Sequence, residues 1–144
     1  LNVLRSKAIM RWNLPSLELS QNYLFFYDQL EKANLYLQGV IDTRKQSFDD
    51  RMVDWLFQNP LSDGGTFCGV ADLVAKYGVM PKEAFPETFQ SNNTSGFTSV
   101  MKQLLRQQGL ELRAMGESKK VTDKQLQAKK VEMLGEIYRM LTLA

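Results

Sequence analysis

The sequence predicts a mainly α-helical protein. Apolar residues recur at spacings of three and four through most of the chain, which is the period of an amphipathic helix. Residues that favour helix N-caps precede several of these stretches, and Gly or Asn-Pro follows several of them. The expected β-structure is limited to a short strand at Val79 and Met80.

Length and composition indicate one globular domain, or a substantial piece of one. The chain has 144 residues, of which 44% are hydrophobic and 24% charged, so it can bury a sizeable core. It lacks an uninterrupted apolar run of about 18 residues, so we expect no transmembrane helix. The single cysteine, Cys68, cannot form an internal disulfide, which favours a reducing compartment and a cytoplasmic location.

The sequence contains no histidine, and this excludes several kinds of site within these residues. A Cys–His or Ser–His–Asp nucleophile system needs an imidazole as its base. Structural zinc needs a Cys/His cluster, which a chain with one cysteine and no histidine cannot build. We therefore predict no catalytic residue, no metal and no cofactor in this chain.

Charge is unevenly distributed, although the net charge is only +2. Residues 1–96 hold nine Lys/Arg and eleven Asp/Glu, a net charge of −2, whereas residues 97–144 hold nine and five, a net charge of +4. A solvated helix face is the favoured interpretation of this excess. Nucleic-acid binding stays open as an alternative.

The first two helices are predicted at residues 1–12 and from Ser20 onward. The first has no N-cap residue before it, so we expect the sequence to be a piece of a longer chain, and Pro15 ends it. Gly39 is the expected stop of the second helix, and a polar loop follows at residues 40–46. The aromatic residues of the second helix have helical spacing, which favours core packing over a platform for stacking bases.

A third helix is predicted from Ser47, which forms a variant capping box with Asp50, to Asn59 and Pro60. Its expected buried stripe consists of Met52, Val53, Leu56 and Phe57, with Trp55 at an edge. A fourth helix follows from about Phe67 to Tyr77, with Phe67, Val70, Ala71 and Val74 on one face and Gly78 as its stop.

The loop between these two helices, Ser62-Asp63-Gly64-Gly65, is the first candidate for a functional site. Two adjacent glycines leave the backbone N–H and C=O groups without side chains to shield them. Taken alone, the tetrapeptide favours a simple turn before a helix. The other interpretation is a backbone edge that an extended ligand can approach closely.

The last third of the chain has a different character. Residues 90–96 are predicted to form a polar linker. Two helices follow, one over residues 97–116 that Gly109 weakens, and one from Asp123 to the end, which Thr122 and Gln125 cap with a capping box. Their expected buried residues include Leu104, Leu105, Leu112, Leu126, Val131 or Lys130, Met133 and Ile137. We therefore divide the chain at residue 96, with a helical hairpin over residues 97–144.

Three blocks of sequence resemble the bleomycin hydrolase and aminopeptidase C family of papain-like cysteine peptidases. They are LSQNYLFFYDQLEKAN (19–34), NPLSDGGTFCGVADLVAKYGVMPK (59–82) and EIYRMLTL (136–143). The resemblance implies that residues 1–96 are part of the helical left-hand domain of such a peptidase. It also implies that residues 97–144 are a helical insertion for oligomer assembly, in an intact protein that forms a homo-hexamer.

The resemblance also implies which parts of the active site this chain lacks. The nucleophilic Cys and the oxyanion-hole Gln would precede Leu1, and the His and Asn would follow residue 144. The chain alone is therefore expected to be inactive. Cys68 lies in an apolar helical pattern without a His to activate it, and we expect a small buried hydrophobe there.

What the resemblance does place in this chain is one wall of the substrate cleft. Gly65 matches the glycine whose backbone pairs with the substrate residue that comes one position before the residue at the cleaved bond. Gly64 precedes it. The implied substrate-binding residues are Asp63, Gly64, Gly65, Thr66 and Phe67, with Ser62 and Asp63 shaping the loop. The function implied is a cysteine-type aminopeptidase acting on peptides. The alternative is a non-catalytic helical module for assembly or nucleic-acid binding.

Overall fold

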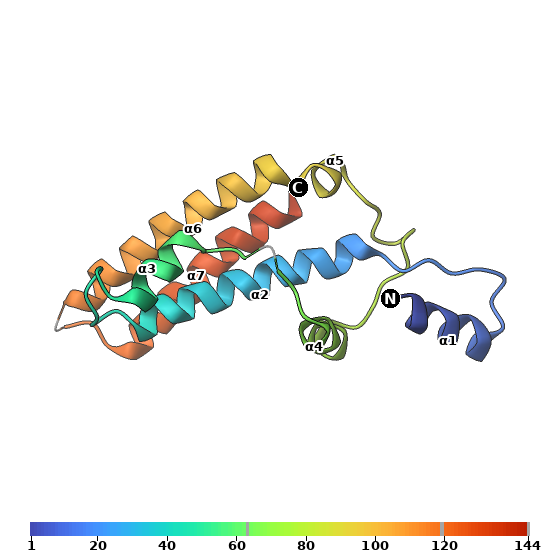
Figure 1. Ribbon diagram of the computed structural model, residues 1–144, viewed down its shortest axis with the longest axis horizontal. Coiled ribbons are helices and arrows are strands. Elements are labelled where there is room, and N and C mark those ends of the chain that lie inside the picture. Colours follow the sequence, from blue (N-terminus) through green and yellow to red (C-terminus); the bar gives the residue numbers. More distant parts are fainter. Residues whose placement is uncertain (63, 119, 144) are drawn as a thin grey trace. The chain divides into compact units, whose positions relative to one another are not determined.

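The computed structural model describes residues 1–62, 64–118 and 120–143, and it confirms a mainly α-helical fold (Figure 1). The helices are α1 (Asn2–Trp12), α2 (Gln21–Asp42), α3 (Arg51–Gln58), α4 (Phe67–Tyr77), α5 (Phe89–Asn92), α6 (Thr94–Glu117) and α7 (Asp123–Thr142). These residues contain no strand, so the strand predicted at Val79 and Met80 is wrong. An isolated antiparallel bridge joins Leu19 to Pro81 instead, and Pro81 cannot donate the hydrogen bond that would extend a ladder.

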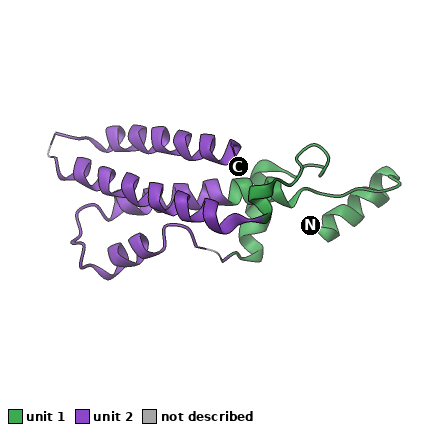
Figure 2. Cartoon of the chain, turned by 90° about the horizontal axis from the view of Figure 1, so that it is seen from above, with its two compact units in different colours: residues 1–28, 65–92 green, residues 29–64, 93–144 purple. Residues whose placement is uncertain are grey.

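The chain divides into two compact units (Figure 2). Unit 1 comprises residues 1–28 and 65–92, and unit 2 comprises residues 29–64 and 93–144. These units are defined by compactness, whereas the division predicted at residue 96 concerns function, and it stays a prediction.

Unit 2 is built on α6 and α7, which pack against each other as the predicted hairpin. Its core is apolar and is contributed by four helices and by the residues after α3. The fully or almost fully buried side chains are Ala33, Tyr36, Leu37, Val40, Ile41, Val53, Leu56, Leu61, Met101, Leu105, Leu112, Leu126, Met133, Ile137 and Leu141. Val131, a predicted core residue, is 65% exposed, because it lies on the face of α7 opposite this stripe.

Helix α2 does not stop at Gly39, as predicted, but continues to Asp42. A Cβ atom on Gly39 would lie 3.1 Å from Leu56 Cδ2, so this glycine lets α3 pack closely against α2. Val40 and Ile41, predicted to begin a polar loop, are 0% and 3% exposed. Burial of these two side chains outweighs the weak local signal of a glycine.

Helix α3 begins at Arg51, so its N-cap lies three residues after Ser47, the predicted N-cap. Asp50 is its N-cap, and its carboxylate accepts a hydrogen bond of 2.8 Å from the backbone N–H of Met52. Met52 and Trp55 are each 54% exposed, while Val53 and Leu56 are buried. The predicted burial of Met52 is therefore wrong, because the shorter helix turns only one narrow face to the core.

The polar stretch 90–96 is largely helical rather than a linker. Thr88 and Ser91 exchange hydrogen bonds at the start of α5, from Thr88 N to Ser91 Oγ (2.8 Å) and from Ser91 N to Thr88 Oγ1 (3.0 Å). Helix α6 then begins at Thr94. Short hydroxyl side chains satisfy free backbone N–H groups at helix starts, so here they nucleate helix rather than loop.

Unit 1 contains α1, the first turns of α2, α4 and α5. Leu24, Phe26 and Leu73 are its buried apolar residues. Phe26 contacts Tyr27 and Phe85 edge to face. Tyr23 makes edge-to-face contacts with the same two rings, at 5.0 and 5.6 Å between ring centroids. None of the residues of α1 is buried.

Candidate functional site

The candidate substrate wall begins at the N-terminus of α4 in unit 1. Thr66 is the N-cap, with an extended backbone (φ −113°, ψ 158°), and its hydroxyl accepts a hydrogen bond of 3.1 Å from Gly69 N. Because the backbone of Thr66 is extended rather than helical, Gly65 lies just before α4 and outside it. Phe67 follows with 87% of its surface exposed, an unusual state for a large apolar side chain.

Gly65 is exposed, and no close contact with the described residues accounts for a glycine there. A Cβ atom built on Gly65 meets no atom within 4 Å. Its backbone is not left-handed; within the described part of the chain, the residues with positive φ are Asn13 and Gly78. Neither a close neighbour among the described residues nor a left-handed backbone accounts for a glycine at this position.

The remaining predicted site residues, Ser62, Asp63 and Gly64, lie outside unit 1 or outside the described residues. Gly64 is also exposed and open, and it is the last residue of the 29–64 segment of unit 2, as Gly65 is the first of the 65–92 segment of unit 1. Ser62 is exposed, and Asp63 lies outside the described residues. Gly65, Thr66 and Phe67 are therefore the three predicted site residues that one unit brings together.

Cys68 is exposed in this structure, so the predicted buried position is wrong. Helix α4 buries Leu73, and Cys68 lies on the first turn with Phe67, where the described chain provides no covering element. Helix α4 therefore has the predicted apolar residues, but the described part of the chain leaves Phe67 and Val70 uncovered.

Sequence reasoning missed Tyr23, whose hydroxyl donates a hydrogen bond of 2.7 Å to the backbone carbonyl of Tyr77 at the end of α4. These residues are 54 positions apart, and the acceptor is a backbone atom that every residue possesses. No pattern in the sequence could have identified this pair.

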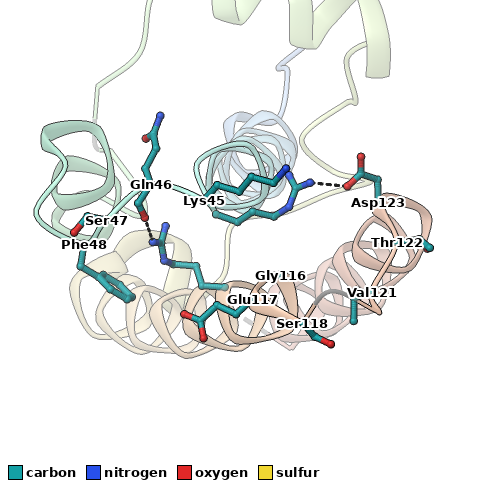
Figure 3. Close-up of a pocket in the computed structure, with 12 residues that line it drawn as sticks. Lys45, Gln46, Ser47, Phe48, Gly116, Glu117, Ser118, Val121, Thr122 and Asp123 are labelled. Carbon is teal, nitrogen blue, oxygen red and sulfur yellow. Dashed lines mark hydrogen bonds and ion pairs between the residues drawn. The ribbon is translucent and has the colours of Figure 1, made fainter.

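Unit 2 contains an open groove of about 1010 Å³ (Figure 3). It is lined by Arg44, Lys45, Gln46, Ser47, Phe48, Arg113, Gly116, Glu117, Ser118, Val121, Thr122 and Asp123. Arg44 Nη2 lies 2.6 Å from Asp123 Oδ1. Arg113 donates hydrogen bonds to the carbonyls of Thr43 and Gln46, and its guanidinium stacks on Phe48 at 4.3 Å. Both arginines therefore already have partners within this chain. Their contacts join the loop after α2 to α6 and α7.

The described residues contain neither a metal-binding cluster nor a membrane-spanning helix. No group of three or more Asp, Glu, Cys or His side chains among them is arranged to hold a metal ion. In the same part of the chain, none of the helices has the length and apolar character needed to cross a bilayer.

Comparison with known proteins gives consistent matches over the whole chain. The profile of the Peptidase C1-like family matches residues 1–144. Aminopeptidase C of Lactobacillus helveticus is 38% identical over 144 residues, and aminopeptidase C of Listeria monocytogenes is 41% identical over 143 residues. Human bleomycin hydrolase is 34% identical over 145 residues, which cover 99% of this chain.

A solved structure agrees with these matches. The crystal structure of PepW from Lactobacillus rhamnosis superposes with a TM-score of 0.91 at 35% identity and covers 99% of this chain. The chain spans 32% of the length of that protein and of the three relatives above. On the strength of the family match over all 144 residues, the chain belongs to the Peptidase C1-like family.

Proposed function

We propose that this chain is part of a cysteine-type aminopeptidase that removes N-terminal residues from peptides. The observation that carries the proposal is the family match over the whole chain, to relatives named aminopeptidase C and bleomycin hydrolase. The nucleophile of the intact enzyme is a Cys thiolate outside these residues. It attacks the carbonyl carbon, releases the shortened peptide as an amine and forms a thioester, which water then hydrolyses.

The part of the reaction assigned to this chain is substrate recognition. The N–H and C=O of Gly65 pair with the backbone of an extended peptide, as a strand pairs with an exposed edge. The open space at Gly65 and the exposure of Phe67 support this role. Thr66 and Phe67 border the adjacent side-chain pocket.

The assembly and location of the intact protein are further parts of the proposal. Helices α6 and α7 contribute to a thiol-peptidase homo-hexamer, which sedimentation of the full-length protein would test. The location is cytoplasmic, which fractionation of cells would test. The alternative, nucleic-acid binding, rests on the net charge of +4 over residues 97–144, and it requires an affinity that falls steeply with salt concentration.

The substitution Gly65→Val in the full-length enzyme tests the recognition role. We expect KM to rise and kcat/KM to fall by about tenfold, since two backbone hydrogen bonds contribute roughly 1–3 kcal/mol. Thermal unfolding should stay close to wild type, because a Cβ atom at this exposed position meets no atom of the described residues within 4 Å.

Gly96→Val is the matched control, since a Cβ atom at Gly96 also meets no atom within 4 Å. It should leave the kinetic constants unchanged. If Gly65→Val has unchanged kinetics as well, Gly65 has no part in the site.

A further inference from the structure

Helix α4 is held by its C-terminal end. Of its 11 residues, only Leu73 is buried by the described part of the chain. At the N-terminal end, Phe67 is 87% exposed and Val70 is 42% exposed. At the C-terminal end, the last residue, Tyr77, makes two direct contacts with α2.

Two tyrosines from the first turns of α2 make these contacts. The hydroxyl of Tyr23 donates a hydrogen bond of 2.7 Å to the carbonyl of Tyr77. The last carbonyls of a helix lack partners within it, so Tyr23 satisfies a group that would otherwise need water. The ring of Tyr27 stacks on that of Tyr77, with centroids 3.9 Å apart and planes inclined by 16°.

The same end of α2 also holds the segment that follows α4. The hydroxyl of Ser20 donates to the carbonyl of Phe85 at 2.6 Å, and its backbone N–H donates to the carbonyl of Met80 at 2.8 Å. Ser20 is 2% exposed, so water cannot easily replace these bonds. The path of the chain leaving α4 is thereby fixed to α2.

We propose that Tyr23 is a positioning residue for the substrate-recognition backbone at Gly65, an inference that rests on the proposed function. A helix of this length is a rod of roughly 16 Å, so a tilt at its C-terminal end displaces its N-terminal end. Gly65 is joined to that N-terminal end by a single residue, the N-cap Thr66. Tyr23 therefore aligns the Gly65 backbone with a peptide that it never touches.

The test uses the full-length enzyme with Tyr23→Phe, which removes the hydroxyl and keeps the ring. The probes are two reversible aldehyde inhibitors, an aminoacyl aldehyde and a dipeptidyl aldehyde. Both have the residue next to the aldehyde, and only the second has the residue before that one, which is the residue that pairs with Gly65. We expect the inhibition constant of the dipeptidyl aldehyde to rise about threefold to tenfold, the range for losing one hydrogen bond between the displaced Gly65 backbone and the inhibitor. The constant of the aminoacyl aldehyde should change much less.

Tyr36→Phe is the matched control. It makes the same change in the same helix, but the hydroxyl of Tyr36 has no hydrogen-bond partner among the described residues. It should leave the ratio of the two inhibition constants unchanged. Tyr27→Leu, which removes the ring stacked on Tyr77, should raise this ratio as Tyr23→Phe does.

A readout independent of inhibition is amide hydrogen exchange. In Tyr23→Phe, exchange should be faster in the peptide covering residues 65–78 and unchanged in residues 29–62. An unchanged ratio of inhibition constants in Tyr23→Phe, when Gly65→Val raises it, would overturn the positioning role and leave the proposed function intact. If neither aldehyde inhibits the wild-type enzyme, the proposed function itself fails.

Discussion

At the scale of single residues, the pair formed by Tyr36 and Gly109 dominates the core of unit 2. Tyr36 is 3% exposed, and its hydroxyl has no partner among the described residues. Burial raises the pKa of this hydroxyl far above its ordinary value, and the charge of Arg106 opposes the shift. The phenol therefore stays neutral at physiological pH. A Cβ atom on Gly109 would lie 2.5 Å from Tyr36 Oη and 3.2 Å from Phe57 Cζ.

Gly109→Ala should therefore destabilise the protein by about 1–3 kcal/mol, the usual cost of overpacking, despite the better helix propensity of alanine. Tyr36→Phe should be neutral or stabilising, because it removes a buried hydroxyl that lacks a partner. In the Tyr36→Phe background Gly109→Ala should cost less, since the closest contact is gone. Denaturant unfolding of the four proteins measures this coupling, and strictly additive free energies would contradict the packing.

At the scale of elements, α7 begins with the capping box that its sequence predicts. Thr122 Oγ1 accepts from Gln125 N at 3.3 Å, and Gln125 Oε1 accepts from Thr122 N at 2.8 Å, so the predicted capping box is confirmed. Lys129 then joins α7 to α6 through an ion pair of 3.0 Å with Glu111. Hydrogen bonds to Glu111 and then to Glu132 raise the pKa of Lys129.

Thr122→Ala should lower the free energy of unfolding by about 1 kcal/mol, because the N-terminal backbone of α7 loses its cap. Thr122→Ser keeps a hydroxyl that can accept from Gln125 N, so it should remain near wild type. Thermal unfolding of the two variants provides the comparison. Equal losses in both would show that the hydroxyl does not stabilise α7.

At the scale of the whole molecule, the proposal assigns this chain a part in substrate recognition and places the catalytic residues outside it. It contains no histidine and places no metal cluster among its described residues. We expect the 144-residue chain alone to give no turnover of an aminoacyl fluorogenic substrate, and thiol-directed inhibitors to have no effect on that result. Full-length protein in the same assay is the positive control. Turnover by the chain alone, reduced by alkylation of Cys68, would reverse the assignment of roles.

The candidate site was partly predictable. Bare backbone at Gly64 and Gly65 and the family resemblance both come from the residues themselves. The structure adds that Gly65 is exposed, that a Cβ atom on it would meet no atom of the described residues within 4 Å, and that Thr66 caps α4. The exposure of Phe67 and Cys68 could not be predicted, because an apolar pattern shows that a face can be covered but not which segment covers it.

The sequence by itself determined the helical class, the positions of α4 and α7 and the caps at Thr122 and Gly78. These features depend on bonds between residues three to five apart, so a short window of sequence contains both partners. Only the tertiary structure decided that Gly39 and Gly109 are packing glycines and that Tyr23 holds the end of α4. Their partners, Leu56, Tyr36 and Tyr77, lie 17, 73 and 54 residues away, and contacts at such separations are set by the packing of helices rather than by any local pattern.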